Sequence, residues 1–262
     1  NFSATGPTAQ TQTAGLYTVQ VTAPNGCTSL QTVPVEIDTI SPIASANGGT
    51  LTCINPFVTL NGGSNISSVL YNWTGPNSFF ATQANYPTDE PGLYLLLLTS
   101  PNGCTGTAST QVLQDTLAPD LALNGNTLLT CTQTTSTIQA SSATSGVNWS
   151  WTGPGNFTAS TPDITVSLPG NYIAMATATN GCSAISTISV NQNTLPPTAL
   201  AMGGTVTCST QIITLSGQSG DPGATFLWTG PGSFSASVPM PTTSLAGTYM
   251  LTVTGANGCS AT

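Results

Sequence analysis

Residues 151–182 read WTGPGNFTASTPDITVSLPGNYIAMATATNGC and contain three landmarks that recur along the chain. Trp-Thr-Gly-Pro begins at Trp73, Trp151 and Trp228, Gly-x-Tyr ends at Tyr17, Tyr94, Tyr172 and Tyr249, and Asn-Gly-Cys ends at Cys27, Cys104, Cys182 and Cys259. A fourth landmark, Leu-Thr-Cys or Val-Thr-Cys, ends at Cys53, Cys131 and Cys208. Consecutive copies of every landmark are 77 or 78 residues apart, so the chain is a tandem repeat.

Short connectors separate the repeats. They read Asp-Thr-Ile-Ser-Pro at 38–42, Asp-Thr-Leu-Ala-Pro at 115–119 and Asn-Thr-Leu-Pro-Pro at 193–197. Proline discourages a regular element from running through such a segment, so the connectors predict domain boundaries. We expect the back part of a repeat at 1–40, complete repeats at 41–117 and 118–195, and a repeat without its last strand at 196–262. We also expect the chain to be a segment of a longer array.

Each repeat reads as short β-strands. Asn-Gly turns between β-rich runs predict hairpins, and helical periodicity is absent from the sequence. A Trp on a middle strand and a Gly-x-Tyr at the start of a late strand are typical anchors of an immunoglobulin-like core. The predicted fold class is therefore all-β, a tandem array of immunoglobulin-like β-sandwiches. Its core anchors are Trp73, Trp151, Trp228, Tyr17, Tyr94, Tyr172 and Tyr249.

The charge composition excludes several kinds of function. The 262 residues include 8 acidic side chains and no Lys, Arg or His, which gives a net charge of −8. An average chain of this length carries roughly 30 Lys and Arg residues. Without His or Lys the chain lacks the usual catalytic bases, and without cations it cannot neutralise nucleic-acid phosphates or an anionic membrane. We therefore predict a protein that is not an enzyme and that has no cofactor, no nucleic-acid partner and no inserted membrane segment.

The motifs, once assembled, resemble a known group. The order Leu-Thr-Cys, Trp-Thr-Gly-Pro-Gly-x-Phe, Pro-Gly-x-Tyr, Asn-Gly-Cys and Asp-Thr-x-x-Pro is similar to PKD/Ig-like repeats of very large Bacteroidota surface proteins. These include gliding-motility adhesins of the SprB type, which the type IX secretion system exports. The resemblance covers the whole chain and implies an extracellular, cell-surface stalk or filament.

The seven cysteines also indicate an oxidising compartment, and two pairing schemes are open. Pairing within each repeat gives Cys53–Cys104, Cys131–Cys182 and Cys208–Cys259, with the partner of Cys27 outside the chain. Pairing across each connector gives Cys27–Cys53, Cys104–Cys131 and Cys182–Cys208 instead. Spacing does not separate the two schemes. We favour the first, because a self-contained repeat can fold and oxidise as it emerges.

The connectors hold the remaining candidate sites. Asp38 and Asp115 recur, and oxygen ligands at a domain junction would suit Ca²⁺, although one carboxylate per junction is few. The plain alternative is an Asp that bonds nearby backbone N–H groups in a turn. Given the resemblance, Asp-Thr-Ile and Asp-Thr-Leu match a Bacteroidota O-glycosylation pattern, which makes Thr39 and Thr116 candidate sites.

These observations favour a structural segment of a long extracellular fibre or surface adhesin, with roles in reach, display and adhesion. Its partners would be neighbouring repeats of the same chain and possible further copies in a fibre, with an unknown surface or glycan target. The alternative is an array of carbohydrate- or protein-binding modules. A hydrolase built on paired carboxylates is a third class, and it is disfavoured because neither pair, Glu36 with Asp38 nor Asp89 with Glu90, recurs as a pair.

Overall fold

The computed structural model describes residues 2–262, and these residues form β-strands with three short 3₁₀ turns. This confirms the predicted all-β class. The chain divides into two compact units, and the division between Asp115 and Thr116 falls in the second connector.

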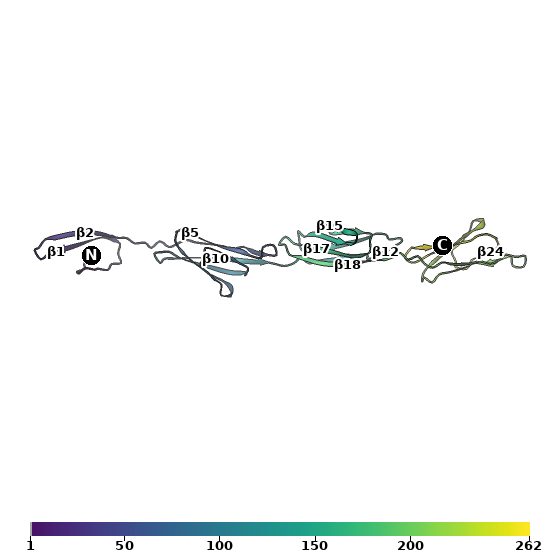
Figure 1. Ribbon diagram of the computed structural model, residues 1–262, viewed down its shortest axis with the longest axis horizontal. Coiled ribbons are helices and arrows are strands. Elements are labelled where there is room, and N and C mark those ends of the chain that lie inside the picture. The colour runs from purple at the N-terminus through teal and green to yellow at the C-terminus, as the bar shows by residue number, and fades with distance from the viewer. Residues whose placement is uncertain (1) are drawn as a thin grey trace. The chain divides into compact units, whose positions relative to one another are not determined.

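The first unit begins with one antiparallel hairpin and continues with a two-sheet sandwich (Figure 1). The hairpin consists of β1 (Gly15–Thr22) and β2 (Thr28–Val35). The sandwich has a three-stranded sheet in the order β3-β5-β8 and a five-stranded sheet in the order β4-β10-β9-β6-β7. Its elements are β3 (Ala44–Asn47), β4 (Thr50–Thr52), β5 (Val58–Ser64), β6 (Leu70–Thr74), η1 (Pro76–Ser78), β7 (Phe80–Ala81), β8 (Asn85–Thr88), β9 (Gly92–Thr99) and β10 (Thr105–Asp115).

The second unit holds the next two repeats. Residues 122–193 repeat the same sandwich, with sheets in the orders β11-β13-β16 and β12-β18-β17-β14-β15. The elements are β11 (Ala122–Gly125), β12 (Leu128–Thr130), β13 (Ser136–Ser141), β14 (Asn148–Gly153), η2 (Pro154–Asn156), β15 (Phe157–Ala159), β16 (Asp163–Val166), β17 (Gly170–Thr177) and β18 (Ser183–Asn193).

The last repeat has shorter strands. They pair in the orders β19-β21, β20-β24 and β23-β22-β25-β26. The elements are β19 (Leu200–Met202), β20 (Ile213–Thr214), β21 (Ser216–Gln218), β22 (Thr225–Gly230), η3 (Pro231–Ser233), β23 (Phe234–Ala236), β24 (Thr242–Thr243), β25 (Met250–Thr254) and β26 (Ser260–Ala261).

Each sandwich closes around one tryptophan. Trp73, Trp151 and Trp228 are at most 1% exposed, each in a separate core cluster. The Nε1 of Trp151 donates to the backbone oxygen of Thr161 at 2.9 Å, which satisfies the polar edge of a buried ring. The predicted role of these residues as core anchors agrees with this burial.

The Gly-x-Tyr residues form tyrosine corners. Each hydroxyl donates at 2.9 Å to the backbone oxygen of the residue four positions earlier, as Tyr94 does to Glu90 and Tyr172 does to Leu168. Tyr94 and Tyr172 are buried, whereas Tyr17 and Tyr249 are half-buried. The corner therefore fixes the start of the strand that leads into the Asn-Gly-Cys hairpin.

The glycine of Trp-Thr-Gly-Pro makes room for this tyrosine. A Cβ at Gly153 would lie 2.5 Å from Cδ1 of Tyr172, and one at Gly75 would lie equally close to Tyr94. The ring also meets the Phe of Gly-Pro-Gly-x-Phe edge to face, with ring centroids of Phe157 and Tyr172 5.4 Å apart. The motif is thus one packed unit.

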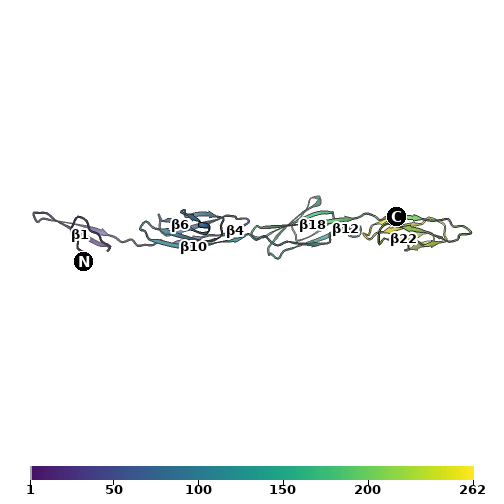
Figure 2. The same cartoon turned by 90° about the horizontal axis from the view of Figure 1, so that it is seen from below.

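A parallel strand pair determines where the Leu-Thr-Cys cysteines lie. β4 pairs in parallel with the end of β10, and β12 pairs in parallel with the end of β18. Thr130 is opposite Asn193, the first residue of the third connector. Figure 2 shows β12 beside β18. Cys131 directly follows β12 and therefore lies where the chain leaves the repeat.

Replacing Tyr94 by Phe tests the corner. The Tyr94 hydroxyl donates to the backbone oxygen of Glu90 and lies 2.7 Å from the Oγ1 of buried Thr88, so its loss leaves the Glu90 carbonyl and the Thr88 hydroxyl each short of a partner. We expect the free energy of unfolding to fall by about 1–3 kcal/mol in urea denaturation. The half-buried Tyr71 of the same repeat is the matched control, and Y71F should change it by less than about 0.5 kcal/mol. Equal effects would contradict the prediction.

Asp120 fastens the start of the third repeat to the loop at 142–144. Its carboxylate accepts hydrogen bonds from the backbone N–H of Ala143 and Thr144 and from the hydroxyls of Ser142 and Thr144. These donors, led by the Ala143 N–H, lower the pKa of Asp120 from 3.8 to about 2. The ionised form is therefore the one that the folded chain stabilises.

The lowered pKa fixes the sign of a pH dependence. The contribution of Asp120 to stability is complete above about pH 4 and is lost as the pH falls towards its folded pKa near 2. We expect D120N to lower the melting temperature at pH 7. Between about pH 4 and pH 2, we expect the melting temperature of D120N to fall less than that of the wild type. D163N, at an exposed carboxylate of the same repeat, is the control. A D120N profile parallel to the wild type would overturn the assignment.

Candidate functional site at the junctions between repeats

The Asn-Gly-Cys segments form identical tight hairpins. In the last repeat, Gly255 N–H donates to the oxygen of Cys259, and Gly258 N–H donates to the oxygen of Gly255, both at 2.9 Å. Gly258 adopts a φ of +72°, a conformation that favours glycine. The Oδ1 of Asn257 accepts from Cys259 N–H at 3.0 Å, and the same bond recurs at Asn25, Asn102 and Asn180.

The other end of the same asparagine side chain holds the preceding connector. Asn257 Nδ2 donates to the backbone oxygen of Leu195 at 2.9 Å and to the Oδ1 of Asn193 at 3.0 Å. In the first unit, Asn102 donates equivalently to the oxygen of Ile40 at 3.0 Å and to the Oδ1 of Asp38 at 2.9 Å. Asn180 donates to the oxygen of Leu117 at 3.0 Å. We call this arrangement the asparagine clamp.

The clamp explains why either Asp or Asn can stand at the start of the connector. Asp38 Oδ1 accepts both from Asn102 and from the backbone N–H of Ile40, at 3.2 Å, which makes an Asx turn. Asn193 supplies the same kind of acceptor oxygen to Asn257. A neutral amide can therefore stand where the other connectors carry a carboxylate. The plain alternative of a turn-forming Asp holds at this position.

The other connector residues differ in burial. The prolines Pro42, Pro119 and Pro197 are buried, which anchors the chain just beyond the clamp. Asp115 ends β10 and is exposed. Within residues 2–262, no group of three or more His, Cys, Asp or Glu residues could hold a metal ion. Thr39 and Thr116 are exposed, and their glycosylation stays a prediction.

A disulfide crosses the junction beside the clamp. Cys131 of the third repeat is bonded to Cys259 of the fourth, with Cα atoms 5.1 Å apart and a sequence separation of 128. The backbone N–H of Cys131 also donates to the oxygen of Asn257 at 3.2 Å. The Leu-Thr-Cys turn of one repeat and the Asn-Gly-Cys hairpin of the next are therefore in direct contact.

Both predicted pairing schemes are wrong. Cys131–Cys182 and Cys208–Cys259 are replaced by Cys131–Cys259, and Cys53–Cys104 fails because Cys104 is a free thiol, as are Cys27 and Cys208. The same findings exclude Cys27–Cys53, Cys104–Cys131 and Cys182–Cys208. Cys53 and Cys182 are disulfide-bonded.

Strand length gives the physical reason for this correction. Cys182 immediately precedes β18, whereas Cys131 lies at the far end of that strand, next to Asn193. The 11 residues of β18 span about 36 Å, and the two Cα atoms of a disulfide lie within about 7 Å. The two cysteines of one sandwich therefore sit at opposite ends of it.

The asparagines of the clamp were missed by sequence reasoning. The sequence predicts a hairpin turn at Asn-Gly-Cys, and the structure has it. That turn involves only the backbone and the Oδ1 atom of the asparagine, whereas the clamp depends on its Nδ2 atom. The available signal was the recurrence of Asn102, Asn180 and Asn257 at a fixed 62 or 63 residues after a connector residue.

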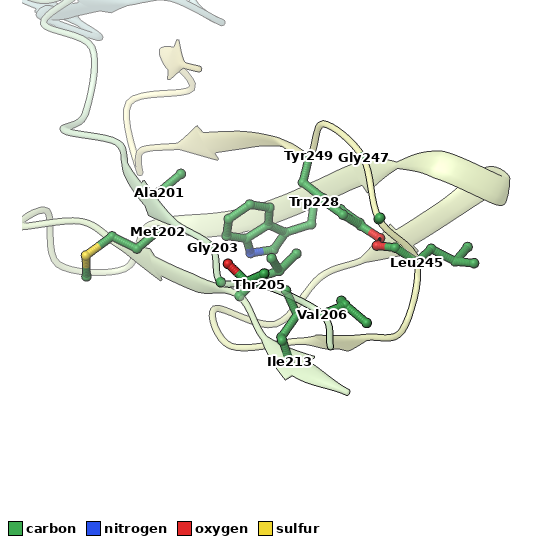
Figure 3. A pocket seen from close by; sticks show the side chains of 13 residues that line it. Ala201, Met202, Gly203, Thr205, Val206, Ile213, Trp228, Leu245, Gly247 and Tyr249 are labelled. Atoms are coloured by element: carbon green, nitrogen blue, oxygen red, sulfur yellow. Dashed lines mark hydrogen bonds between the residues drawn. The ribbon is translucent and has the colours of Figure 1, made fainter. Parts of the chain in front are cut away.

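A pocket of about 370 Å³ lies in the last repeat, where Figure 3 shows Trp228 and Tyr249 among the lining residues. Val206 in its wall corresponds to Leu51 and Leu129, which are buried on strands that pair with β10 and β18 in the other sandwiches. In the last repeat, β26 spans only Ser260–Ala261, so no strand pairs with residues 205–207. The pocket is therefore the uncovered end of a core, and its geometry does not indicate a ligand site.

Comparisons with known proteins yield similarity in fold only. No protein-family model matches the chain, and no curated protein matches it. Sidekick-1 immunoglobulin domains 1–5 are 12% identical with a TM-score of 0.35, over 97% of this chain and 66% of that one. A tetra-tandem repeat in the extending region of a large adhesion protein is 14% identical with a TM-score of 0.29, over 94% of this chain and 79% of that one. The amphioxus IgVJ-C2 molecule is 12% identical with a TM-score of 0.26, over 58% of this chain and 99% of that one.

At these identities and TM-scores, no conclusion about the function of this chain follows from the matches. Among residues 2–262, no helix is long and apolar enough to span a membrane.

Replacing Asn257 by Ala tests the clamp. The variant loses the Cys259 turn bond and the bonds from Nδ2 to Asn193 and Leu195 of the connector, so we expect a loss of about 1–3 kcal/mol in stability. We also expect faster proteinase K cleavage at residues 193–195 of the connector. N25A is the matched control, because Asn25 makes the same turn bond, and its hairpin precedes the first connector. If N25A and N257A were cleaved at the same rate near Leu195, the clamp would have no role in holding the connector.

Proposed function

We propose that the chain is a structural repeat segment of a long extracellular fibre or surface adhesin, which provides reach, display and adhesion. The observation that carries the proposal is the Cys131–Cys259 disulfide, which joins two consecutive repeats beside their connector. The two cysteines lie outside the core clusters of their sandwiches. Their bond holds neighbouring repeats together, which is what a stalk under tension requires.

Three further observations support the proposal. Disulfides persist mainly in oxidising compartments, which favours an extracellular location. The asparagine clamp recurs at the connectors that precede Asn102, Asn180 and Asn257, so the contact between hairpin and connector is a property of the repeat itself. The sequence lacks Lys, Arg and His, which supports a role that is not enzymatic.

The resemblance of the motifs to Bacteroidota surface repeats supports finer proposals. These are export by type IX secretion, a part in gliding motility, attachment at the cell surface, and O-linked glycans on Thr39 and Thr116. Both threonines are exposed in connectors and follow an Asp. Intact-mass measurement of native material would reveal the glycans, and unmodified Thr39 and Thr116 would refute them.

Immunogold labelling of intact cells that produce the protein tests the main proposal. With an antibody against the repeats, we expect gold particles in regular rows along filaments outside unpermeabilised cells. Permeabilised cells are the control, and labelling confined to them would overturn the extracellular assignment. A soluble glycan that raises the melting temperature of the repeats would favour the alternative of a binding-module array.

A further inference from the structure

The free and bonded cysteines follow one rule along the chain. In the Cys131–Cys259 disulfide, a Leu-Thr-Cys cysteine is joined to the Asn-Gly-Cys cysteine of the next repeat. Cys53 and Cys182, which are also disulfide-bonded, occupy the equivalent positions one repeat earlier. By this rule, Cys27 and Cys104 need a Leu-Thr-Cys cysteine from a preceding repeat, and Cys208 needs an Asn-Gly-Cys cysteine from a following repeat. These three are the free cysteines.

We propose that Cys27, Cys104 and Cys208 are half-sites for bridges to further copies of this repeat, so that every junction of the array is closed by the same staggered disulfide. The inference rests on the proposed function and names the partner of these thiols. The partner of Cys208 is an Asn-Gly-Cys hairpin, and the partner of Cys27 and Cys104 is a Leu-Thr-Cys turn.

The turn at Cys208 already has the geometry of the bonded one. Thr207 N–H donates to the oxygen of Thr210, and Thr210 N–H donates to the Oγ1 of Thr207, both at 2.9 Å. At Cys131 the same two bonds link Thr130 and Gln133 at 2.8 and 3.0 Å. The threonine of the motif thus shapes the turn that presents the sulfur, and Cys208 is exposed.

The hairpins at Cys27 and Cys104 are equally complete. Asn25 and Asn102 accept from the cysteine N–H at 3.1 and 2.9 Å, as Asn257 does at 3.0 Å. The glycines of the two hairpins have φ values of +81° and +83°, close to the +72° of Gly258. Both halves of the bridge are therefore formed before the partner arrives.

Closure of each bridge is a thiol–disulfide exchange. One S–S bond forms between Cys208 and the partner cysteine, and both S–H bonds break. The two protons and two electrons pass to an oxidised disulfide donor, either a protein oxidoreductase or a small-molecule disulfide, which becomes a dithiol. No other group changes its oxidation state.

Counting thiols in the oxidised, denatured chain is the first test. The staggered rule predicts three free thiols among seven cysteines, whereas either sequence-based scheme predicts one. C259A should raise the count from three to four, because it frees Cys131. C104A is the matched control and should lower the count to two, with the melting temperature unchanged. A count of one in the parent chain would overturn the proposal.

Lengthening the chain tests the partner itself. Residues 186–262, with the copy of Cys208 changed to Ala, are appended after Thr262, which continues the period and adds one cysteine to the seven. We expect two free thiols, and a peptic peptide containing Cys208 cross-linked to the copy of the Cys259 peptide, which ends at the new C-terminus. Four free thiols, or Cys208 cross-linked to the original Cys259, would overturn the proposal. Neither result depends on where the cell places the protein, so failure here is distinct from failure of the surface-labelling experiment.

Discussion

The parallel pairing of a short strand with the end of the last strand of the same sandwich is the constraint from which the junction follows. In the third repeat this pairing sets Thr130 opposite Asn193 and so delivers Cys131 to the point where the chain leaves the domain. The antiparallel hairpin of the same sandwich delivers Cys182 to the opposite end. Sulfurs at opposite ends cannot bridge one sandwich, and Cys131 is bonded to Cys259 of the next repeat instead.

The asparagine clamp and the disulfide act on the same few residues. Asn257 orients Cys259 through its Oδ1 atom and fixes Leu195 through its Nδ2 atom. The Cys131 N–H in turn bonds the Asn257 backbone. Hydrogen bonds donated by neutral amides suit a chain without Lys or Arg, because a junction held by ion pairs would need cations that the sequence lacks.

The sequence alone predicts the fold but not the disulfide pairing or the asparagine clamp at the junction. Period, hairpin turns, the Trp cores and the tyrosine corners all follow from local patterns, since each motif and its packing partners lie within one repeat. The disulfide register did not follow, because it depends on which end of a sandwich each cysteine occupies. That placement comes from the parallel register of Leu128–Thr130 with Asn191–Asn193, a long-range pairing of three residues with no pattern of its own. The asparagine clamp was missed for a similar reason, since Asn257 and Leu195 belong to different elements.

The separation of 128 residues across the Cys131–Cys259 bridge sets the extensibility of the second unit. Tension applied between Leu117 and Thr262 travels along the backbone to Cys131, crosses the sulfurs, and leaves from Cys259. The polypeptide between the two cysteines, most of both sandwiches, lies outside this shortest covalent route. If it unfolded without the bridge, it would add roughly 430 Å of slack. With the bridge closed, unfolding of either sandwich lengthens the unit hardly at all, so the tether keeps its length even when a domain fails.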